Sequence, residues 1–258
     1  MDIVNVAAVQ SPRMSMEQAL EYVTGELAEI LENQKYDILL LPEKWINGNI
    51  EQATEDIGKI VGHFADLSRK TGSVIVPGSF SIYRDDKLYN SSPVIFGGEI
   101  LGWQDKITLF REEKKYYTSG KEIGVFNAGG LKLGVAVCYD ADFPYFTKVA
   151  VSRGAEIMLN PSLIVNKFHD MWYIYIKSRS LENRIPFVSV NSISDPFNGS
   201  SIITKPEPYD FGVKLRSEIF GKEPLISSRI ELGPLRELIT RRFDEDPGSY
   251  SLNGDKLI

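Results

Sequence analysis

Short apolar segments alternate with segments of helical periodicity along most of this chain of 258 residues. Residues 3–9 (IVNVAAV) and 37–41 (DILLL) are apolar runs with the length of buried strands. Between them, apolar residues recur at i, i+3, i+4 and i+7 over residues 16–31, which predicts an amphipathic helix. Buried strands that alternate with helices indicate an α/β fold whose sheets are covered by helices.

The same patterns predict further elements along the chain. We expect strands at residues 73–80, 88–96, 99–103, 131–137, 156–159, 186–191, 201–204 and 225–231, and helices at 54–70, 143–153, 167–183 and 234–241. Gly97 and Gly98 separate two of these strands and indicate a hairpin. No linker rich in Gly, Ser or Pro divides the chain, so we expect residues 1–258 to form a single domain. We expect the polar tail, residues 244–258, to be either mobile or held against a neighbouring subunit.

The charge and composition of the chain argue against several classes of protein. Its 35 acidic residues outnumber its 29 basic residues, whereas binding to nucleic acid needs a basic face. No apolar run approaches the roughly 20 residues of a membrane span, and the N-terminus lacks the pattern of a signal peptide. The single cysteine excludes an intrachain disulfide and fits a reducing compartment. We therefore expect a cytoplasmic protein that binds neither nucleic acid nor membrane.

Three chemically useful side chains follow predicted strands. Cys138 follows the run KLGVAV, Glu43 follows DILLLP, and Lys106 follows GEILGWQD. Open α/β sheets carry their chemistry in loops beyond the carboxyl ends of strands. Taken singly, each residue has an ordinary alternative role: the thiol as a small buried hydrophobe, the glutamate as a helix cap and the lysine as a surface charge. Taken together, they supply a nucleophile, a base and a cation.

A cysteine nucleophile needs a group that takes its proton, because a thiol with a pKa of about 8.5 is only a few per cent ionised at neutral pH. The chain has two histidines, His63 and His169. His63 lies within a predicted helix and no site motif surrounds His169, so a carboxylate base is the stronger hypothesis and a Cys138–His169 pair the weaker one. One cysteine and two histidines also make a zinc site hard to assemble, and we expect neither a metal nor another cofactor.

Six segments carry a family resemblance. They are LLLPEKW (39–45), LYNSSPVIFGGEILGWQDKITLF (88–110), GVAVCYDADFP (134–144), GAEIMLNPS (154–162), RSLENRIPFVSVN (179–191) and GSSIITKP (199–206). In this order they resemble the motifs of the nitrilase, or carbon–nitrogen hydrolase, superfamily. The resemblance runs from residue 3 to about residue 206 and is weak beyond it. It implies an αββα sandwich, in which two sheets pack face to face with helices on the outer faces, and a homodimer or larger homo-oligomer.

The resemblance also implies a catalytic group made of Glu43, Lys106 and Cys138. The family has a second glutamate after the lysine; the segment EKKYYTSG places Glu113 at that position, and the adjacent Glu112 is its competitor. We expect Glu43 to take the proton of the thiol. We also expect the N-terminus of the helix that follows Cys138 to lower the pKa of the thiol.

Tyr139, Asp142 and Trp172 are the expected substrate-binding residues. The backbone N–H of Tyr139 would hold the oxyanion together with Lys106, and Trp172 matches an aromatic wall of the family's pocket. Asp142 stands where many relatives carry arginine, which would pair with an acidic substrate. We therefore expect better hydrolysis of neutral or amine-bearing amides than of acid-bearing ones. The alternative is that Asp142 caps a helix beginning at Phe143.

The residues and the resemblance together predict a hydrolase of small molecules. It would cleave the C–N bond of a small amide or N-carbamoyl compound through a cysteine thioester and release ammonia. Two alternatives stay open: a glutaminase-like subunit that supplies ammonia to a separate synthetase, and a non-catalytic binding scaffold with the same fold. The chain carries no P-loop, so the synthetase of the first alternative would be another polypeptide.

Overall fold

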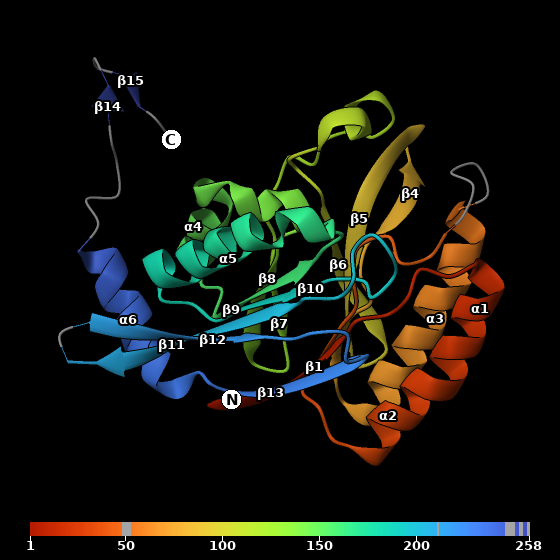
Figure 1. The fold of residues 1–258 in the computed structure, drawn as a ribbon, viewed down its shortest axis with the longest axis horizontal. Coiled ribbons are helices and arrows are strands. Elements are labelled where there is room, and N and C mark those ends of the chain that lie inside the picture. The colour runs from red at the N-terminus through yellow and green to blue at the C-terminus, as the bar shows by residue number, and fades with distance from the viewer. Residues whose placement is uncertain (48–52, 211, 246–250, 253–254, 257–258) are drawn as a thin grey trace.

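The computed structural model of the protein describes residues 1–47, 53–210, 212–245, 251–252 and 255–256. Two β-sheets pack face to face at its centre (Figure 1). The first sheet has the strand order β13-β1-β2-β3-β5-β4, with β6 paired to β5. Its strands are β1 (Ile3–Val9), β2 (Ile38–Leu40), β3 (Val74–Val76), β4 (Phe80–Arg84), β5 (Lys87–Phe96), β6 (Glu99–Asp105) and β13 (Leu225–Glu231).

The second sheet has the strand order β12-β11-β10-β9-β8-β7. Its strands are β7 (Val125–Ala128), β8 (Leu131–Val135), β9 (Ile157–Pro161), β10 (Phe187–Val190), β11 (Ile202–Tyr209) and β12 (Gly212–Ile219). The central strands β8, β9 and β10 run parallel, as do β1, β2 and β3 of the first sheet. Parallel strands direct their carboxyl ends to one edge of a sheet, so each sheet presents several strand-end loops on one side.

Helices cover the outer face of each sheet, which completes an αββα sandwich (Figure 1). The first sheet is covered by α1 (Met16–Tyr22), a π-helical turn (Val23–Leu27), α2 (Ala28–Asn33) and α3 (Ala53–Thr71). The second is covered by α4 (Pro144–Ser152) and α5 (His169–Asn183), while α6 (Gly233–Asp244) contacts β11. None of the helices in the described residues combines the length and the apolar character that a bilayer span requires.

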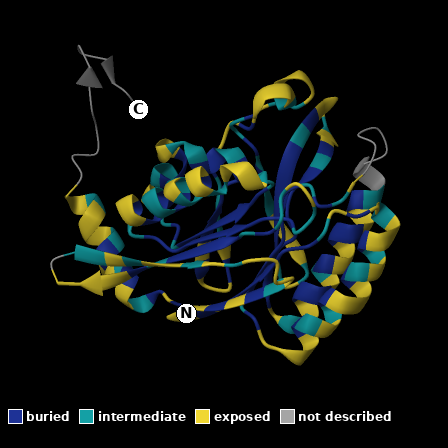
Figure 2. Ribbon diagram, in the orientation of Figure 1, coloured by how far each residue is buried: buried dark blue, intermediate teal, exposed yellow. Residues whose placement is uncertain are grey.

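The core consists of one layer between the sheets and one layer beneath each set of helices. Successive side chains of a strand point to opposite faces. In β1, Val4, Val6 and Ala8 therefore belong to the layer between the sheets, whereas Ala7 and Val9 belong to the layer beneath α1 and α3. Central strands covered on both faces must be apolar at every position, and Figure 2 shows them buried along their length. This is why the sequence presents them as continuous apolar runs.

The predicted α/β class and the sandwich are confirmed, and most predicted elements lie within a few residues of the observed ones. The predicted helix at residues 16–31 is interrupted by the π-helical turn. The strands β7 and β12 were not predicted. Strand β12 is an edge strand with mostly exposed or half-buried residues, so it has no continuous apolar run. The predicted strand at residues 73–80 contains two strands, separated by a turn at Gly78.

The C-terminal tail predicted at residues 244–258 lies largely outside the described residues. Two short strands within it, β14 (Ser251–Leu252) and β15 (Asp255–Lys256), pair with each other and lie apart from the sandwich in Figure 1. Its contact with a neighbouring subunit stays a prediction, as do the single domain and the homo-oligomer.

Gly78 supports the turn that carries Glu43. Its φ of +87° lies in the left-handed region, and a Cβ atom at this position would lie 2.0 Å from the carbonyl oxygen of Pro42. The same Cβ would lie 2.9 Å from the ring of Trp45. Since the first contact is with backbone, the turn itself would have to move to accept any side chain here.

We predict that Gly78→Ala destabilises the protein and displaces Glu43. Overpacking typically costs about 1–3 kcal/mol, and alanine at a positive φ adds to that cost. Thermal unfolding measures the loss. Gly62→Ala is the matched control, because a Cβ on this residue of α3 meets no atom within 4 Å, and alanine favours a helix. Equal stability of the two variants would contradict the prediction.

Candidate active site

Loops from both sheets bring the three predicted strand-end residues to one cavity. Glu43 follows β2 and Lys106 follows β6 in the first sheet, and Cys138 begins a 3-10 turn after β8 in the second. All three line a cavity of about 460 Å³. The exposed fractions of Glu43, Lys106 and Cys138 are only 3%, 2% and 7%. The group is therefore shielded from bulk water but accessible from the cavity.

Lys106 is the centre of a network of charged side chains. Its Nζ lies 2.9 Å from Oε1 of Glu43 and 2.8 Å from Oε2 of Glu113. The other oxygen of Glu113 lies 2.9 Å from Nζ of Lys44, and the amide of Asn90 donates to Oε1 of Glu43 at 2.7 Å. Two carboxylates and two ammonium groups thus balance one another in a buried place, where an unpaired charge would be costly.

These contacts shift the pKa values of the charged side chains. Burial alone would lower the pKa of Lys106, but the charges of Glu43, Cys138 and Glu113 raise it well above its ordinary value. Burial likewise opposes the ionisation of Glu113, but the charges of Lys106 and Lys44 lower its pKa to about 2. Lys106 is therefore a permanent cation and Glu113 a permanent anion at neutral pH.

The structure places Glu113, and not Glu112, in this network. Glu112 forms an exposed ion pair with Lys115 on the outer side of the 3-10 turn at Arg111–Lys115. Glu113 faces inward, and its Oε2 also accepts the backbone N–H of Phe110 at 2.9 Å. The predicted position of the second glutamate is therefore the one that reaches Lys106.

The backbone and the pKa of Cys138 distinguish it from an ordinary buried cysteine. Its φ is +47°, a left-handed conformation that costs a non-glycine residue about 1–3 kcal/mol and is concentrated at functional sites. Burial and then the charge of Glu43 raise the pKa of the thiol well above its ordinary value, although Lys106 and the backbone N–H of Leu163 act in the opposite direction. The resting thiol is therefore protonated at neutral pH.

The expected lowering of the thiol pKa by a helix N-terminus is therefore wrong. Cys138 is followed by a 3-10 turn, and α4 begins only at Pro144. Proline has no N–H group to direct at the sulfur, and the effect of a helix dipole falls off within its first turn. Ionisation of Cys138 thus depends on proton transfer to a neighbouring base, and Glu43 lies close enough for its charge to raise the pKa of the thiol.

Asp140 ties the cysteine turn to the lysine loop, a role that the sequence did not reveal. Its buried carboxylate accepts the backbone N–H of Val137 at 3.2 Å, within its own turn. It also accepts the N–H groups of Thr108 at 2.7 Å and Ile107 at 3.2 Å, the two residues after Lys106. Burial raises the pKa of Asp140 to about 7, against the opposing effect of these hydrogen bonds. The carboxyl group sets the spacing of the two loops.

The three predicted substrate-binding residues all line the cavity. The ring of Tyr139 packs edge-on between Phe110 and Phe143, at centroid distances of 5.0 and 5.3 Å. Trp172 donates its indole N–H to Oγ of Ser189 at 3.0 Å, so its ring is a fixed apolar wall. Further apolar residues that line the cavity lie on both sides of Trp172 along the chain: Leu163, Ile164, Val165, Phe168, Met171 and Tyr175.

The alternative that Asp142 caps a helix is wrong. The N-cap of α4 is Phe143, and no side chain caps this helix. Burial raises the pKa of Asp142 to about 6, while the charges of Arg179 and Lys106 oppose the rise. Arg179 forms an ion pair with Glu182, at 2.8 Å.

Neither histidine belongs to the site. His63 is exposed on α3, and the ring of His169 lies 3.2 Å from the carbonyl oxygen of Ile164 and does not line the cavity. In the described part of the chain, no group of three or more His, Cys, Asp or Glu side chains is arranged to hold a metal ion. The structure therefore favours the carboxylate base over a Cys138–His169 pair.

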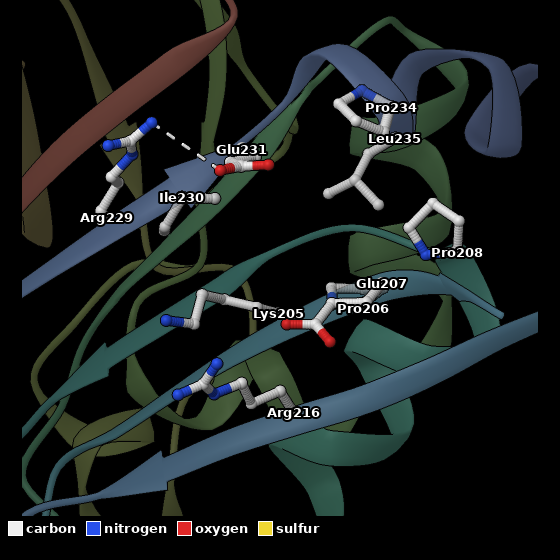
Figure 3. A pocket seen from close by; sticks show the side chains of 10 residues that line it. All are labelled: Lys205, Pro206, Glu207, Pro208, Arg216, Arg229, Ile230, Glu231, Pro234 and Leu235. Carbon is white, nitrogen blue, oxygen red and sulfur yellow. Dashed lines mark ion pairs between the residues drawn. The ribbon is translucent and has the colours of Figure 1, made fainter.

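A second cavity, of about 360 Å³, lies between β11, β12, β13 and the start of α6 (Figure 3). Its basic side chains are paired: Lys205 lies 2.6 Å from Glu218, and Arg229 lies 3.8 Å from Glu231. Its lining, within the described ranges, includes neither cysteine nor histidine. It offers no nucleophile, so the cavity at Cys138 is the candidate active site.

An αββα sandwich that brings a thiol, a carboxylate and an ammonium group to one cavity is the architecture of a nitrilase-superfamily hydrolase. The chain belongs to the carbon–nitrogen hydrolase family, whose model matches residues 5–207. A nitrilase of Pyrococcus abyssi is 28% identical over 222 residues, which are 80% of this chain and 82% of that protein. The 2-oxoglutaramate amidase of Bacillus subtilis is 27% identical over 187 residues, 68% of this chain and 72% of that protein.

The fold is shared with solved structures. The crystal structure of a carbon–nitrogen hydrolase from Helicobacter pylori matches with a TM-score of 0.82 at 19% identity, over 95% of this chain and 96% of that one. The family match and this fold identify the protein as a carbon–nitrogen hydrolase of the nitrilase superfamily.

We predict that Glu43→Gln lowers the pKa of Cys138. The substitution removes a charge that raises this pKa and leaves the ammonium group of Lys106 near the sulfur. Because Cys138 is the single cysteine, the rate of its alkylation by iodoacetamide, followed by intact mass against pH, reports the ionisation of this thiol. Glu112→Gln, on the exposed side of the turn, is the control and should leave the thiol pKa where it is. An equal or higher pKa in Glu43→Gln would show that the carboxylate does not act on the thiol.

We predict that Lys44 positions Glu113, and through it Lys106. Lys44→Met should lower kcat/KM for amide hydrolysis by about tenfold or more, the equivalent of one lost charge-assisted hydrogen bond, and Lys44→Arg should restore most of it. Lys115→Met is the matched control, because it removes a lysine from an exposed glutamate pair. A Lys44→Met variant as active as Lys115→Met would rule out the positioning role.

Proposed function

We propose that the protein hydrolyses a small amide or N-carbamoyl compound through a thioester on Cys138 and releases ammonia. The observation that carries the proposal is the convergence of Glu43, Lys106 and Cys138 on one shielded cavity. The family membership and the amidase among the relatives support the same reaction.

In the first half of the reaction, Glu43 takes the proton of Cys138 and the sulfur attacks the carbonyl carbon of the amide. Proton transfer at this point is required, because the resting thiol has a raised pKa. The negative charge that develops on the carbonyl oxygen is held by Lys106 and by the backbone N–H of Tyr139. A preformed cation in a shielded site stabilises such a charge more strongly than water does.

In the second half, the tetrahedral intermediate collapses and the C–N bond breaks. Glu43 gives its proton to the leaving nitrogen, which departs as ammonia and leaves an acyl group on the sulfur. Glu43 then takes a proton from water, the hydroxide attacks the thioester, and the thiol is restored as the carboxylic acid leaves. These steps use side chains and water alone. Glu113 stays ionised throughout and keeps Lys106 in place.

The cavity also bears on the two alternatives. A binding scaffold has no need of a buried lysine held by two glutamates beside a thiol in a strained backbone conformation. A glutaminase-like subunit would use the same chemistry on glutamine. This hypothesis therefore differs from that of a stand-alone amidase only in the substrate. We also expect the protein to be a homo-oligomer and to be located in the cytoplasm, and both expectations are part of the proposal.

We predict that Cys138→Ala abolishes ammonia release from any amide that the wild-type protein hydrolyses. A panel of linear amides, N-carbamoyl compounds, nitriles and glutamine is screened for ammonia, and the intact mass of the protein is measured during turnover. The wild-type protein should gain the mass of one acyl group, and Cys138→Ala should gain none. Thermal unfolding controls for the fold of the variant. Full activity of Cys138→Ala, or an acyl group on another residue, would end the proposal.

A further inference from the structure

Asp142 lines the active-site cavity, and one of its carboxylate oxygens has no hydrogen-bond partner among the described residues. Asp142 lines the same cavity as Cys138 and follows it by four residues along the chain. Its Oδ1 atom is buried and accepts no hydrogen bond within the part of the chain that the structure describes. A shielded carboxylate oxygen without a donor is costly in free energy, so its presence in a cavity points to a donor supplied from outside the protein.

The basic side chain nearest to Asp142 is engaged elsewhere. Arg179 donates from Nε to the carbonyl oxygen of Ala141 at 3.0 Å and from Nη2 to the carbonyl oxygen of Asp142 at 2.7 Å. Its Nη1 donates to Glu182 at 2.8 Å. The guanidinium group therefore fixes the backbone of Asp142, and none of these hydrogen bonds goes to the carboxylate.

The other charged side chains that line the cavity are either paired with opposite charges or exposed to solvent. Glu43 and Glu113 are paired with Lys106 and Lys44, so their carboxylates are occupied. The remaining cation of the lining, Arg111, is exposed to solvent and lies over the ring of Phe110 at 5.1 Å. An exposed charge is screened by water and discriminates weakly between ligands, whereas the buried oxygen of Asp142 is not screened in this way.

The rest of the lining is largely apolar and aromatic, and includes Tyr139, Phe168, Met171 and Trp172. Walls of this kind suit a short aliphatic chain, and aromatic faces also favour a nearby cation. The cavity thus combines a reactive thiol, apolar walls and one free anionic group.

We propose that the substrate carries a cationic group, bound by Asp142, on a short aliphatic chain that ends in the amide. This substrate class rests on the amide hydrolysis proposed above. The ammonium group donates to the carboxylate of Asp142 while the amide carbon lies against the sulfur of Cys138. The charge of Asp142 disfavours a substrate that ends in a carboxylate.

Three amides of similar length test the proposal: 5-aminopentanamide as the cation, hexanamide as the neutral compound and the monoamide of glutaric acid as the anion. Each is assayed for ammonia release with the wild-type protein, Asp142→Asn and Asp170→Asn. Asp170 is exposed on α5 and does not line the cavity, so its variant makes the same change of charge outside the site. The readout is the ratio of kcat/KM for the cationic amide to that for the neutral amide.

The wild-type protein should favour the cationic amide over the neutral one by about tenfold or more, and the anionic amide should be the poorest substrate. Asp142→Asn should lower the cationic-to-neutral ratio by about tenfold, and Asp170→Asn should keep the wild-type ratio. Cys138-dependent hydrolysis of hexanamide without a preference for the cation, or a ratio that Asp142→Asn leaves unchanged, would overturn this inference and leave the proposed function standing. If none of the three amides yields ammonia or an acyl adduct on Cys138, this inference fails, and the proposed function fails with it only if the wider panel of amides, N-carbamoyl compounds and glutamine yields none either.

Discussion

The buried ammonium group of Lys106 is the interaction on which the site depends. A lysine with 2% of its surface exposed is stable in a protein only if opposite charges surround it, and Glu43 and Glu113 lie within 2.9 Å of its nitrogen. These carboxylates come from different loops of the first sheet, so the pairing also fixes where the loops lie. The cation that would stabilise an oxyanion is therefore in place before any substrate binds. Holding it there requires the specific contacts of Lys106 with both glutamates.

The second sheet supplies the nucleophile, and one carboxyl group sets its distance from the cation. Asp140 accepts backbone N–H groups from its own turn and from the residues after Lys106, so it links the cysteine turn to the lysine loop. The turn places Cys138 in a left-handed conformation beside Glu43. The burial of Cys138 keeps its thiol protonated, which makes the neighbouring base essential to the proposed reaction.

Much of the site could be predicted because its parts follow strands that the sequence marks clearly. Glu43, Lys106 and Cys138 each follow a predicted strand, and the family resemblance placed Glu113 ahead of Glu112. Lys44, Asn90 and Asp140 were missed for one reason: their partners are 32 to 69 residues away along the chain. A contact at that separation leaves no periodic signal. The direction of the thiol pKa was wrong because a 3-10 turn, and not the start of α4, follows Cys138.

The sequence by itself determined the layered α/β class, because the continuous apolar runs of strands such as β1 and β2 are stable only when both faces are covered. It also determined which side chains stand at the strand ends, because Pro42 and the polar residues after Val137 interrupt those runs. Only the tertiary structure decided which of them meet, what each carboxylate binds, and that Asp142 has a free buried oxygen. The physical reason is that burial and charge pairing depend on distances between segments remote in the chain, and these exist only once the two sheets have packed.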